Sequence, residues 1–94
     1  MSIEEIRRTV RVVNSQGLHA RPCHSIVSAA QAYSSDLFIK SGGREVNGKS
    51  ILELMTLNAG EGTELEVRAL GGDAQGLVEA IEVLFSEGFG ELAK

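Results

Sequence analysis

Residues 15–25, SQGLHARPCHS, gather the side chains of this chain that are best suited to chemistry. His19 and Arg21 stand where a helical pattern of apolar residues begins. The first N–H groups of a helix lack partners within the helix and attract anions, phosphate in particular. A neutral imidazole can act as a covalent nucleophile, and a guanidinium fork matches the oxygens of a phosphate group. The stretch therefore fits a histidine that accepts a phosphoryl group.

A purely structural explanation fits the same residues equally well on physical grounds. His19 would then only stand at the start of a helix, beside Arg21 as an ordinary solvated arginine. Gly17 serves either explanation, because glycine allows the chain to turn sharply before the helix. Pro22 also serves both, since the first turn of a helix tolerates a residue without an N–H group.

The two residues after Pro22 offer further chemistry that the sequence favours less. Cys23 falls on the apolar stripe of the predicted helix, so we expect a small buried hydrophobe rather than a reactive thiol. His24 falls off that stripe, and we expect it to be solvated. A closed zinc site needs four ligands of the His, Cys or carboxylate type. With one cysteine and two histidines in the chain, we predict no metal site.

Seven regular elements are predicted from periodicity and turn signals. They are a strand over 7–13, a helix over 20–33, strands over 36–40 and 44–47, a helix over 50–57, a strand over 63–70 and a helix from Asp73, its expected N-cap, to near Gly88. This order predicts a single α+β domain over residues 1–94, with an antiparallel sheet and helices on one face. A ferredoxin-like split βαβ arrangement shares most of the pattern, because the sequence alone leaves strand order open.

The segment SILELMTL (50–57) predicts both a capped helix and an exposed apolar surface. Ser50 followed by Glu53 is a capping-box pattern. The segment holds five apolar residues in eight, more than one core-facing stripe can bury, so some should contact partners. Ile51 and Met55 are the candidates for exposure, whereas Leu52 and Leu54 fit burial nearly as well. Lys49 would either steer acidic partners or be simply solvated.

The composition excludes several classes of function. A net charge of −4, with three Phe, one Tyr and no Trp, argues against a general nucleic-acid binder. Cys23 is the only cysteine, so an internal disulfide is impossible and a reducing compartment is expected. No apolar run approaches membrane-spanning length, and the N-terminus MSIEEIRRTV lacks the apolar region of a signal peptide. We therefore expect a cytoplasmic protein that does not act at a membrane.

Three stretches resemble the HPr family, the histidine-containing phosphocarriers of the phosphoenolpyruvate-dependent sugar phosphotransferase system. GLHARP is similar to the active-site signature, VNGKSILELMTLNAGEGTELEV (46–67) to the regulatory-serine region, and SEGFGE to the family's ending. The similarity covers almost the whole chain in one register. It implies an open-faced β-sandwich, in which a four-stranded antiparallel sheet of order 1-4-2-3 is covered on one face by three helices.

The resemblance also implies roles for individual residues. His19 would be phosphorylated at Nδ1 by enzyme I, with Arg21 and the N–H groups of Ala20 and Arg21 holding the phosphoryl group. Ser50 would be the residue that an ATP-dependent HPr kinase/phosphorylase modifies. Enzyme I and enzyme IIA domains would dock on a surface that includes Leu18, Lys49, Ile51 and Met55. The chain would then be a monomeric phosphoryl carrier and not an independent enzyme, and it would need no cofactor.

Two other functions remain open at this point. In the first, the chain is a regulatory binding module whose Ser50-phosphorylated form controls a transcription factor or a kinase without sugar transport. In the second, it is a small ligand- or metal-binding α+β domain in which the motifs arise by chance. Incubation with enzyme I and labelled phosphoenolpyruvate separates the carrier from this last alternative.

Overall fold

Regular elements cover most of residues 4–92, the part of the chain that this computed structural model describes. In chain order the elements are β1 (Glu4–Arg11), α1 (Ala20–Ala30), β2 (Asp36–Ser41), β3 (Arg44–Asn47), α2 (Ile51–Met55), β4 (Glu64–Gly71), α3 (Ala74–Ser86) and the 3-10 turn η1 (Gly88–Gly90). The predicted order of strands and helices is confirmed. The bounds shift by a few residues, since α1 ends where the chain turns at 31–33 and β1 ends before residue 12.

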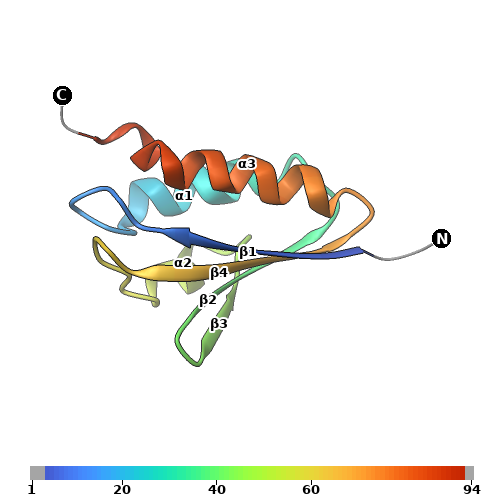
Figure 1. Ribbon diagram of the computed structural model, residues 1–94, viewed down its shortest axis with the longest axis horizontal. Coiled ribbons are helices and arrows are strands. Elements are labelled where there is room, and N and C mark those ends of the chain that lie inside the picture. Colours follow the sequence, from blue (N-terminus) through green and yellow to red (C-terminus); the bar gives the residue numbers. More distant parts are fainter. Residues whose placement is uncertain (1–3, 93–94) are drawn as a thin grey trace.

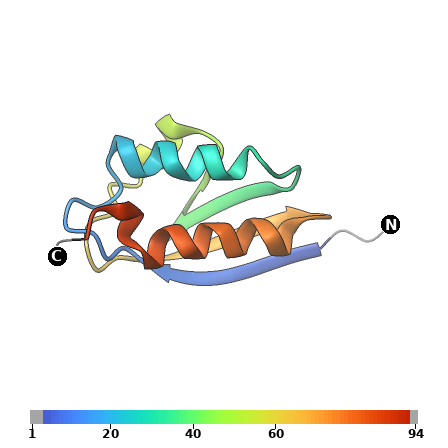
Figure 2. The ribbon, with the colours of Figure 1, turned by 90° about the horizontal axis from the view of Figure 1, so that it is seen from above.

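The four strands form one open sheet in which every neighbouring pair is antiparallel. β1 pairs with β4, β4 with β2 and β2 with β3, which gives the order β1-β4-β2-β3. Helices α1 and α3 lie side by side across one face of the sheet (Figures 1 and 2). Helix α2 packs against α1 and β3. The predicted open-faced β-sandwich, with strand order 1-4-2-3 and three helices, is therefore confirmed.

The hydrophobic core lies between the sheet and the helices and fixes how the helices are placed. The largest fully buried apolar side chains are Val12, Ile26, Leu37, Ile39, Leu54, Leu65, Val67, Leu77, Val78, Ile81 and Phe85. Burying a side chain of this size contributes about 1.5–3 kcal/mol. With α1 and α3 antiparallel on this core, the first turn of α1 and the last turn of α3 lie at the same end of the molecule (Figure 2).

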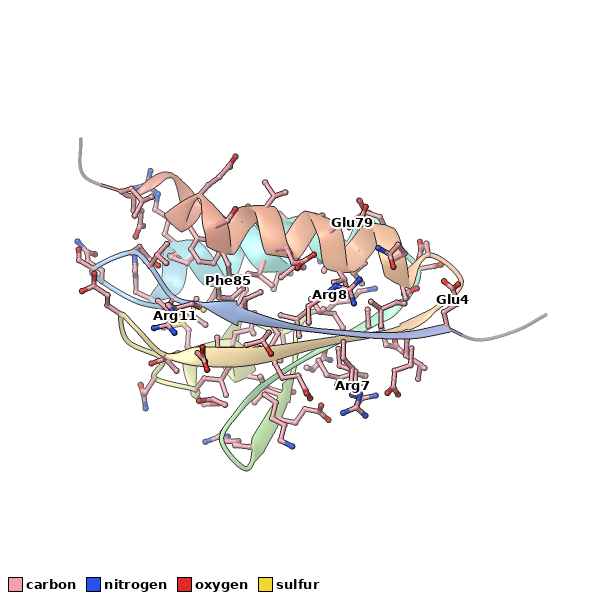
Figure 3. The ribbon with its side chains drawn as sticks, viewed as in Figure 1. Glu4, Arg7, Arg8, Arg11, Glu79 and Phe85 are labelled. Carbon is pink, nitrogen blue, oxygen red and sulfur yellow. The ribbon has the colours of Figure 1, made fainter. Side chains whose placement is uncertain are left out.

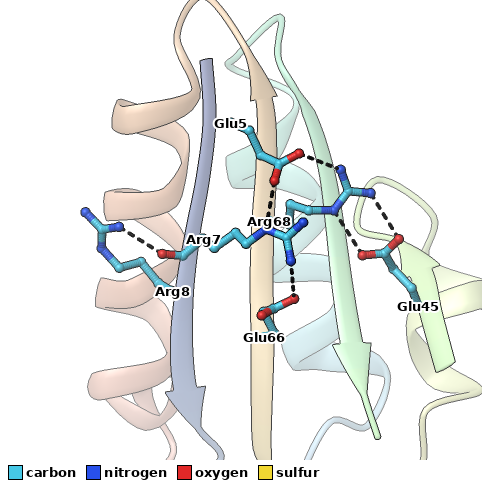
Figure 4. A network of polar contacts seen from close by, with 6 residues as sticks. All are labelled: Glu5, Arg7, Arg8, Glu45, Glu66 and Arg68. Atoms are coloured by element: carbon cyan, nitrogen blue, oxygen red, sulfur yellow. Dashed lines mark hydrogen bonds and ion pairs between the residues drawn. The ribbon is translucent and has the colours of Figure 1, made fainter. Parts of the chain in front are cut away.

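The other face of the sheet carries charged side chains instead of a second layer. Arg68 donates to the Glu45 carboxylate at 3.0 and 3.1 Å, and its guanidinium lies 4.4 Å from the centroid of the Phe38 ring. Arg7 donates to Glu5 at 2.7 Å in the same network (Figure 4). Ion pairs on an exposed surface contribute only about 0–1 kcal/mol each. This face is therefore a solvated surface, and it lies across the sheet from the helices.

Arg8 is a charged residue on the side of β1 that faces the helices. Figure 3 shows Arg8 on the α3 side of β1 and Arg7 on the opposite side. The Arg8 guanidinium lies 4.0 Å from the Glu82 carboxylate of α3. β1 is an edge strand, and an inward-pointing charge is one way in which proteins disfavour pairing of such an edge with another strand.

The prediction that Asp73 caps the last helix holds for its position but not for its side chain. Asp73 stands at the N-cap position of α3, but its side chain makes no cap hydrogen bond to that helix. The carboxylate instead accepts from the Ser35 hydroxyl, and from the N–H groups of Ser34 and Ser35 at 2.9 and 2.8 Å. These hydrogen bonds, led by that of the Ser35 hydroxyl, lower the pKa of the Asp73 carboxyl to about 2. Asp73 therefore joins the turn after α1 to the start of α3.

Candidate functional site

The start of α1 offers backbone donors next to a histidine, as the sequence predicts. His19 is the N-cap residue, with an extended backbone (φ −81°, ψ −172°), and its side chain makes no cap hydrogen bond. The first bond of the helix runs from the Cys23 N–H to the His19 carbonyl at 3.2 Å. The N–H groups of Ala20 and Arg21 precede that bond and have no acceptor within the helix, and Pro22 has no N–H. The helix therefore presents two N–H groups beside His19 that suit an anion.

The loop before His19 is held against the loop after α2. The Leu18 N–H donates to the Ala59 carbonyl at 2.9 Å. Gly17 has φ +70°, and a Cβ atom there would run into the same carbonyl. Only glycine therefore permits this approach. A small hollow beside His19 is lined by Gln16, Leu18, His19, Asn58, Ala59 and Gly60.

Glu91 binds the His19 ring, and sequence reasoning missed it. His19 Nε2 lies 2.9 Å from Glu91 Oε2 and 3.0 Å from Glu91 Oε1. The side chains are 34% and 16% exposed, so water only partly screens the contact. The hydrogen bond to His19 lowers the pKa of the Glu91 carboxyl, and the Asn14 hydrogen bond and the charge of Arg21 act in the same direction against the opposing effect of burial. The carboxylate is therefore ionised beside the ring at neutral pH.

A tight turn after α3 brings Glu91 to this position. Gly88, Phe89 and Gly90 have φ values of +61°, +57° and +76°, in the left-handed region that favours glycine. The Phe89 ring packs edge-on against Phe85, with centroids 4.9 Å apart and an interplanar angle of 68°. This aromatic contact holds the one non-glycine residue of the turn. The glycines of SEGFGE signal a turn in the sequence, but nothing in that segment indicates its partner.

Arg21, His24 and Cys23 occupy different environments in α1. Arg21 is exposed next to His19, and its positive charge acts on the Glu91 carboxylate. His24 is exposed, as predicted. Cys23 is fully buried, and burial raises the pKa of its thiol to about 11. The prediction that Cys23 is buried is confirmed.

Ser50 caps α2, although only half of the expected capping box forms. The Glu53 N–H donates to the Ser50 hydroxyl oxygen at 3.2 Å. The Glu53 carboxylate does not return to the Ser50 N–H but accepts from the Asn47 N–H at 3.0 Å. The Ser50 N–H donates to the Asn47 carbonyl at 3.1 Å. The Ser50 side chain is half-buried at the start of α2.

The apolar surface of α2 differs in part from the predicted one. Leu52 is 79% exposed and Met55 39% exposed, whereas Leu54 is fully buried. Ile51 is partly buried against the core. The expectation that Leu52 could be buried is therefore wrong. Helix α2 has only five residues, and only one side of it, with Leu54, faces the core. The exposed apolar surface of α2 consists of Leu52 and Met55, with Ile51 at its border.

Two other expected surface residues also need correction. Leu18 is only 5% exposed and belongs to the core, because its N–H bond to Ala59 draws the residue inward. Lys49 is not simply solvated, since its Nζ donates to the Tyr33 carbonyl at 2.9 Å, and its role in steering acidic partners stays a prediction. Lys49 thus joins the segment before α2 to the turn after α1.

The described part of the chain contains no group of three or more His, Cys, Asp and Glu side chains placed to hold a metal ion. None of the helices in residues 4–92 has the length and apolar character needed to cross a membrane.

The helix start at His19 suits an anion and stands on an open-faced β-sandwich. The model of the PTS HPr component phosphorylation site matches residues 6–87. The phosphocarrier protein HPr of Treponema pallidum is 43% identical over 84 residues, which cover 89% of this chain and 96% of that protein. The chain therefore belongs to the HPr family of phosphocarrier proteins of the phosphotransferase system.

Solved structures agree with this assignment. HPr from Thermoanaerobacter tengcongensis superposes with a TM-score of 0.89 at 32% identity, covering 94% of this chain and 99% of that one. The Bacillus subtilis catabolite repression protein Crh, described as a domain-swapped intertwined dimer, gives a TM-score of 0.73 at 36% identity and covers 88% of this chain and 95% of that one. The predicted family and fold are confirmed.

Proposed function

We propose that this chain accepts a phosphoryl group from enzyme I on His19 Nδ1 and passes it to enzyme IIA domains for sugar uptake. The observation that carries the proposal is the position of His19 at the start of α1, beside the unpartnered N–H groups of Ala20 and Arg21. Membership of the phosphocarrier family supports the same reaction. The chain acts as a monomeric single domain in the cytoplasm.

Backbone N–H groups and the Arg21 side chain hold the phosphoryl group in this proposal. The N–H groups of Ala20 and Arg21 donate to its oxygens, where the positive end of the helix dipole also favours the charge. The Arg21 guanidinium is exposed and permanently charged, so it reaches phosphoryl oxygens during transfer to a partner. In this proposal the chain receives the phosphoryl group from one protein and hands it to another, so it is a carrier and not an independent catalyst. It needs no cofactor or metal of its own.

Partners dock on the exposed apolar surface of α2. Leu52 and Met55 form its exposed part and Ile51 lies at its border. The loop after α2 is hydrogen-bonded to the loop before His19, from the Leu18 N–H to the Ala59 carbonyl. An apolar patch close to a charged site is typical of a protein-binding surface. Enzyme I and enzyme IIA would contact the same surface in turn, because both must reach His19.

Incubation with enzyme I, magnesium and labelled phosphoenolpyruvate tests the carrier function directly. We expect one acid-labile, alkali-stable phosphoryl group on the wild-type chain and none on His19→Ala. The fold should survive this change, because His19 is partly exposed at the first turn of α1 and lies outside the core. His24→Ala, which removes an exposed histidine of the same helix, is the matched control and should be labelled normally. Label that persists in His19→Ala would contradict the proposal.

A regulatory function at Ser50 is the second candidate, and it can accompany the first. It is supported by the position of Ser50 at the start of α2, where the residue is only half-buried, and by the likeness to Crh, which is described as a catabolite repression protein. In this function an HPr kinase/phosphorylase modifies Ser50, and the phosphorylated form binds a transcription factor or a kinase. Incubation with the purified kinase and ATP, with Ser50→Ala as control, tests it. If His19 is not phosphorylated by enzyme I but Ser50 is modified, only the regulatory function stands.

A further inference from the structure

We propose that the outer edge of β1, together with the groove between β1 and α3, binds an extended peptide segment of another protein. The segment adds a strand beside β1, with an apolar side chain in the groove and a basic side chain two positions away. None of the residues that line this groove belongs to α2 or to the hollow beside His19. Binding here therefore does not depend on phosphorylation of His19.

The groove has a volume of about 700 Å³ and an apolar floor. Val10 and, just beyond β1, Val13 line it on one side, and Val83 and Phe85 of α3 line it on the other. Val83 is 50% exposed, whereas Val10 and Phe85 are buried. An apolar side chain that a partner covers loses its contact with water, which favours binding. Val83 is therefore the apolar anchor that this surface offers.

The edge of β1 offers backbone groups that an added strand can pair with. The Val12 N–H donates to the Thr63 carbonyl at 2.9 Å, and the Val12 carbonyl accepts from the Gly62 N–H at 2.7 Å, so both groups of Val12 point toward the β4 side. Backbone groups of successive residues point to alternate sides along an antiparallel strand. Those of Thr9 and Arg11 therefore point away from β4, toward the open edge of the sheet. An extended peptide that supplies the missing partners binds by strand addition.

Arg8 limits how much of this edge is open. The backbone groups of Arg7 also point outward by the same alternation, but the Arg8 guanidinium donates to the Arg7 carbonyl at 2.8 Å (Figure 4). The same guanidinium lies 4.0 Å from the Glu82 carboxylate. Arg8 therefore covers the edge before residue 9. The part that stays open, residues 9–11, is the part that lines the groove.

The rim of the groove favours a basic side chain in the partner. Its charged residues are Arg11, Glu79 and Glu82. The charge of Arg11 is matched, because its guanidinium donates to the Glu64 carboxylate at 2.9 Å. Glu79 accepts from the neutral Gln75 side chain at 2.7 Å and has no ion-pair partner among residues 4–92. The exposed carboxylate of Glu79 is therefore the group that a lysine or arginine of the partner can pair with.

The spacing of the two contacts matches an extended chain. Glu79 and Val83 are one turn apart on α3, about 6 Å along the helix axis. Helix α3 packs along β1, and Figure 3 shows Phe85 toward the end of β1 and Glu79 nearer its start. Alternate side chains of a strand lie on one face about 6.5 Å apart. A strand beside β1 can therefore place an apolar residue against Val83 and a basic residue, two positions away, against Glu79.

A second copy of this chain fits the surface less well than a basic segment of another protein. Two copies related by a two-fold axis place the same surface patch against itself. Glu79 and Glu82 of one copy would then face the same carboxylates of the other, and like charges across an interface weaken binding. A segment that carries lysine or arginine has the opposite charge to this rim.

A phage-displayed library of short random peptides, selected against the full wild-type chain, tests the proposal. We expect the enriched peptides to share an apolar residue with lysine or arginine two positions away. A synthetic copy of the most enriched peptide, labelled with a fluorophore, then serves as the probe, and its Kd is measured by fluorescence anisotropy. A library that yields no binding peptide would overturn the proposal.

Three variants test the three contacts separately. Val83→Ser removes the apolar anchor, and Glu79→Lys reverses the unmatched charge of the rim. Thr9→Pro removes an outward N–H group from an edge strand, a position at which proline is tolerated. Each change should raise the Kd of the probe peptide about fivefold or more. Urea unfolding shows whether each variant is folded, and if Thr9→Pro is not, the other two decide.

Each variant has a control that makes the same kind of change outside the groove. Leu52→Ser removes an exposed apolar side chain from α2, and Asp36→Lys reverses a charge at the start of β2. Glu5→Pro removes an outward N–H group near the start of β1, away from the residues that line the groove. All three controls should bind the probe peptide as tightly as the wild type.

Two results would assign the surface differently and overturn the proposal. Peptide binding that is lost in Leu52→Ser but kept in Val83→Ser would place the site on α2. Sedimentation velocity of the wild type that shows a dimer, dissociated by Val83→Ser, would make a second copy the occupant of the groove. Peptide binding and phosphorylation of His19 are measured in separate experiments, so failure of the proposed function is distinguished from failure of this inference.

Discussion

The amide of Leu18 and the carbonyl of Ala59 form a 2.9 Å hydrogen bond that joins the loop before His19 to the loop after α2. This bond holds the loop that leads to His19 against the loop that follows α2, the helix that would meet the partners. The bond depends on Gly17, whose missing side chain allows the Ala59 carbonyl to approach.

Gly17→Ala should therefore lower both stability and phosphorylation. The φ of +70° strains any residue with a side chain, and the new Cβ would also press on the Ala59 carbonyl. Gly42→Ala is the matched control, because Gly42 has φ +60° but nothing within 4 Å of the added atom. Urea unfolding should show a loss of about 1–2 kcal/mol for the control, the cost of the left-handed backbone. Gly17→Ala should lose about 1–3 kcal/mol more, the usual cost of overpacking; equal losses would contradict the close approach.

Leu52 and Leu54 should respond to substitution in opposite ways. Leu52 is 79% exposed, so Leu52→Ser should leave the free energy of unfolding within about 0.5 kcal/mol of the wild type. If α2 is the docking surface, Leu52→Ser should weaken the free energy of binding to enzyme I by more than about 1 kcal/mol. Leu54 is fully buried, so Leu54→Ala should lower stability by about 2–5 kcal/mol. Urea unfolding and calorimetric titration check both, and unchanged binding by Leu52→Ser would remove Leu52 from the docking surface.

Arg21 should affect transfer without affecting the fold. It is exposed next to His19, so Arg21→Ala should leave the far-UV circular dichroism spectrum and the unfolding midpoint unchanged. Loss of one donor to a transferring group costs about 2.7–4 kcal/mol in transition-state stabilisation in a favourable case. Arg21→Lys keeps the charge but loses the planar fork, so it should recover only part of the rate. Stopped-flow measurement of transfer to an enzyme IIA domain separates these outcomes, and a normal rate in Arg21→Ala would make Arg21 an ordinary surface residue.

Asp73 should make stability depend on pH in the acid range. Its pKa is lowered from 3.8 to about 2 by hydrogen bonds that exist only in the folded state, so the unfolded chain binds this proton first. The stabilisation is complete above about pH 4 and is lost as pH falls through about 2. The stability difference between the wild type and Asp73→Asn should therefore shrink over this range. Urea unfolding at several pH values measures it, with Asp36→Asn on β2 as control; a constant difference would contradict the assignment.

The sequence predicts this fold well where the signal is local. Alternation along Leu65, Val67 and Ala69 marks β4, and the apolar stripe through Cys23 and Val27 marks α1, because one face of each is buried. The same local pattern places His19 at the start of α1. These predictions depend only on neighbours a few residues apart.

The predictions that fail depend on contacts between distant residues or on short elements. Glu91 lies 72 positions from His19 in the chain, and no spacing rule connects them. The Asp73 carboxylate accepts hydrogen bonds from Ser34 and Ser35, which lie 39 and 38 positions away in the chain. It makes no hydrogen bond to α3, the helix that it was expected to cap. Leu52 could not be assigned a face, because a helix of five residues is too short for its periodicity to be read.

Ser50 should act both as the cap of α2 and as a control point for docking, and two variants separate these roles. The Ser50 hydroxyl accepts the Glu53 N–H at 3.2 Å, so Ser50→Ala should lose the cap and about 0.5–2 kcal/mol of stability. It should not slow phosphorylation of His19, because it adds no charge to the surface. Aspartate is a good N-cap residue, so Ser50→Asp should keep nearly all of the stability.

Ser50→Asp should nevertheless slow phosphorylation of His19 by enzyme I. It places a negative charge next to Ile51 at the border of the exposed apolar surface that includes Leu52 and Met55. Burying this charge against a partner, or opposing it with acidic groups, costs enough free energy to lower the rate by about tenfold or more. Initial rates with enzyme I and phosphoenolpyruvate, compared with urea unfolding of the same variants, test the separation. If Ser50→Asp is phosphorylated at the wild-type rate, and HPr kinase/phosphorylase does not modify the wild type, Ser50 is a helix cap alone.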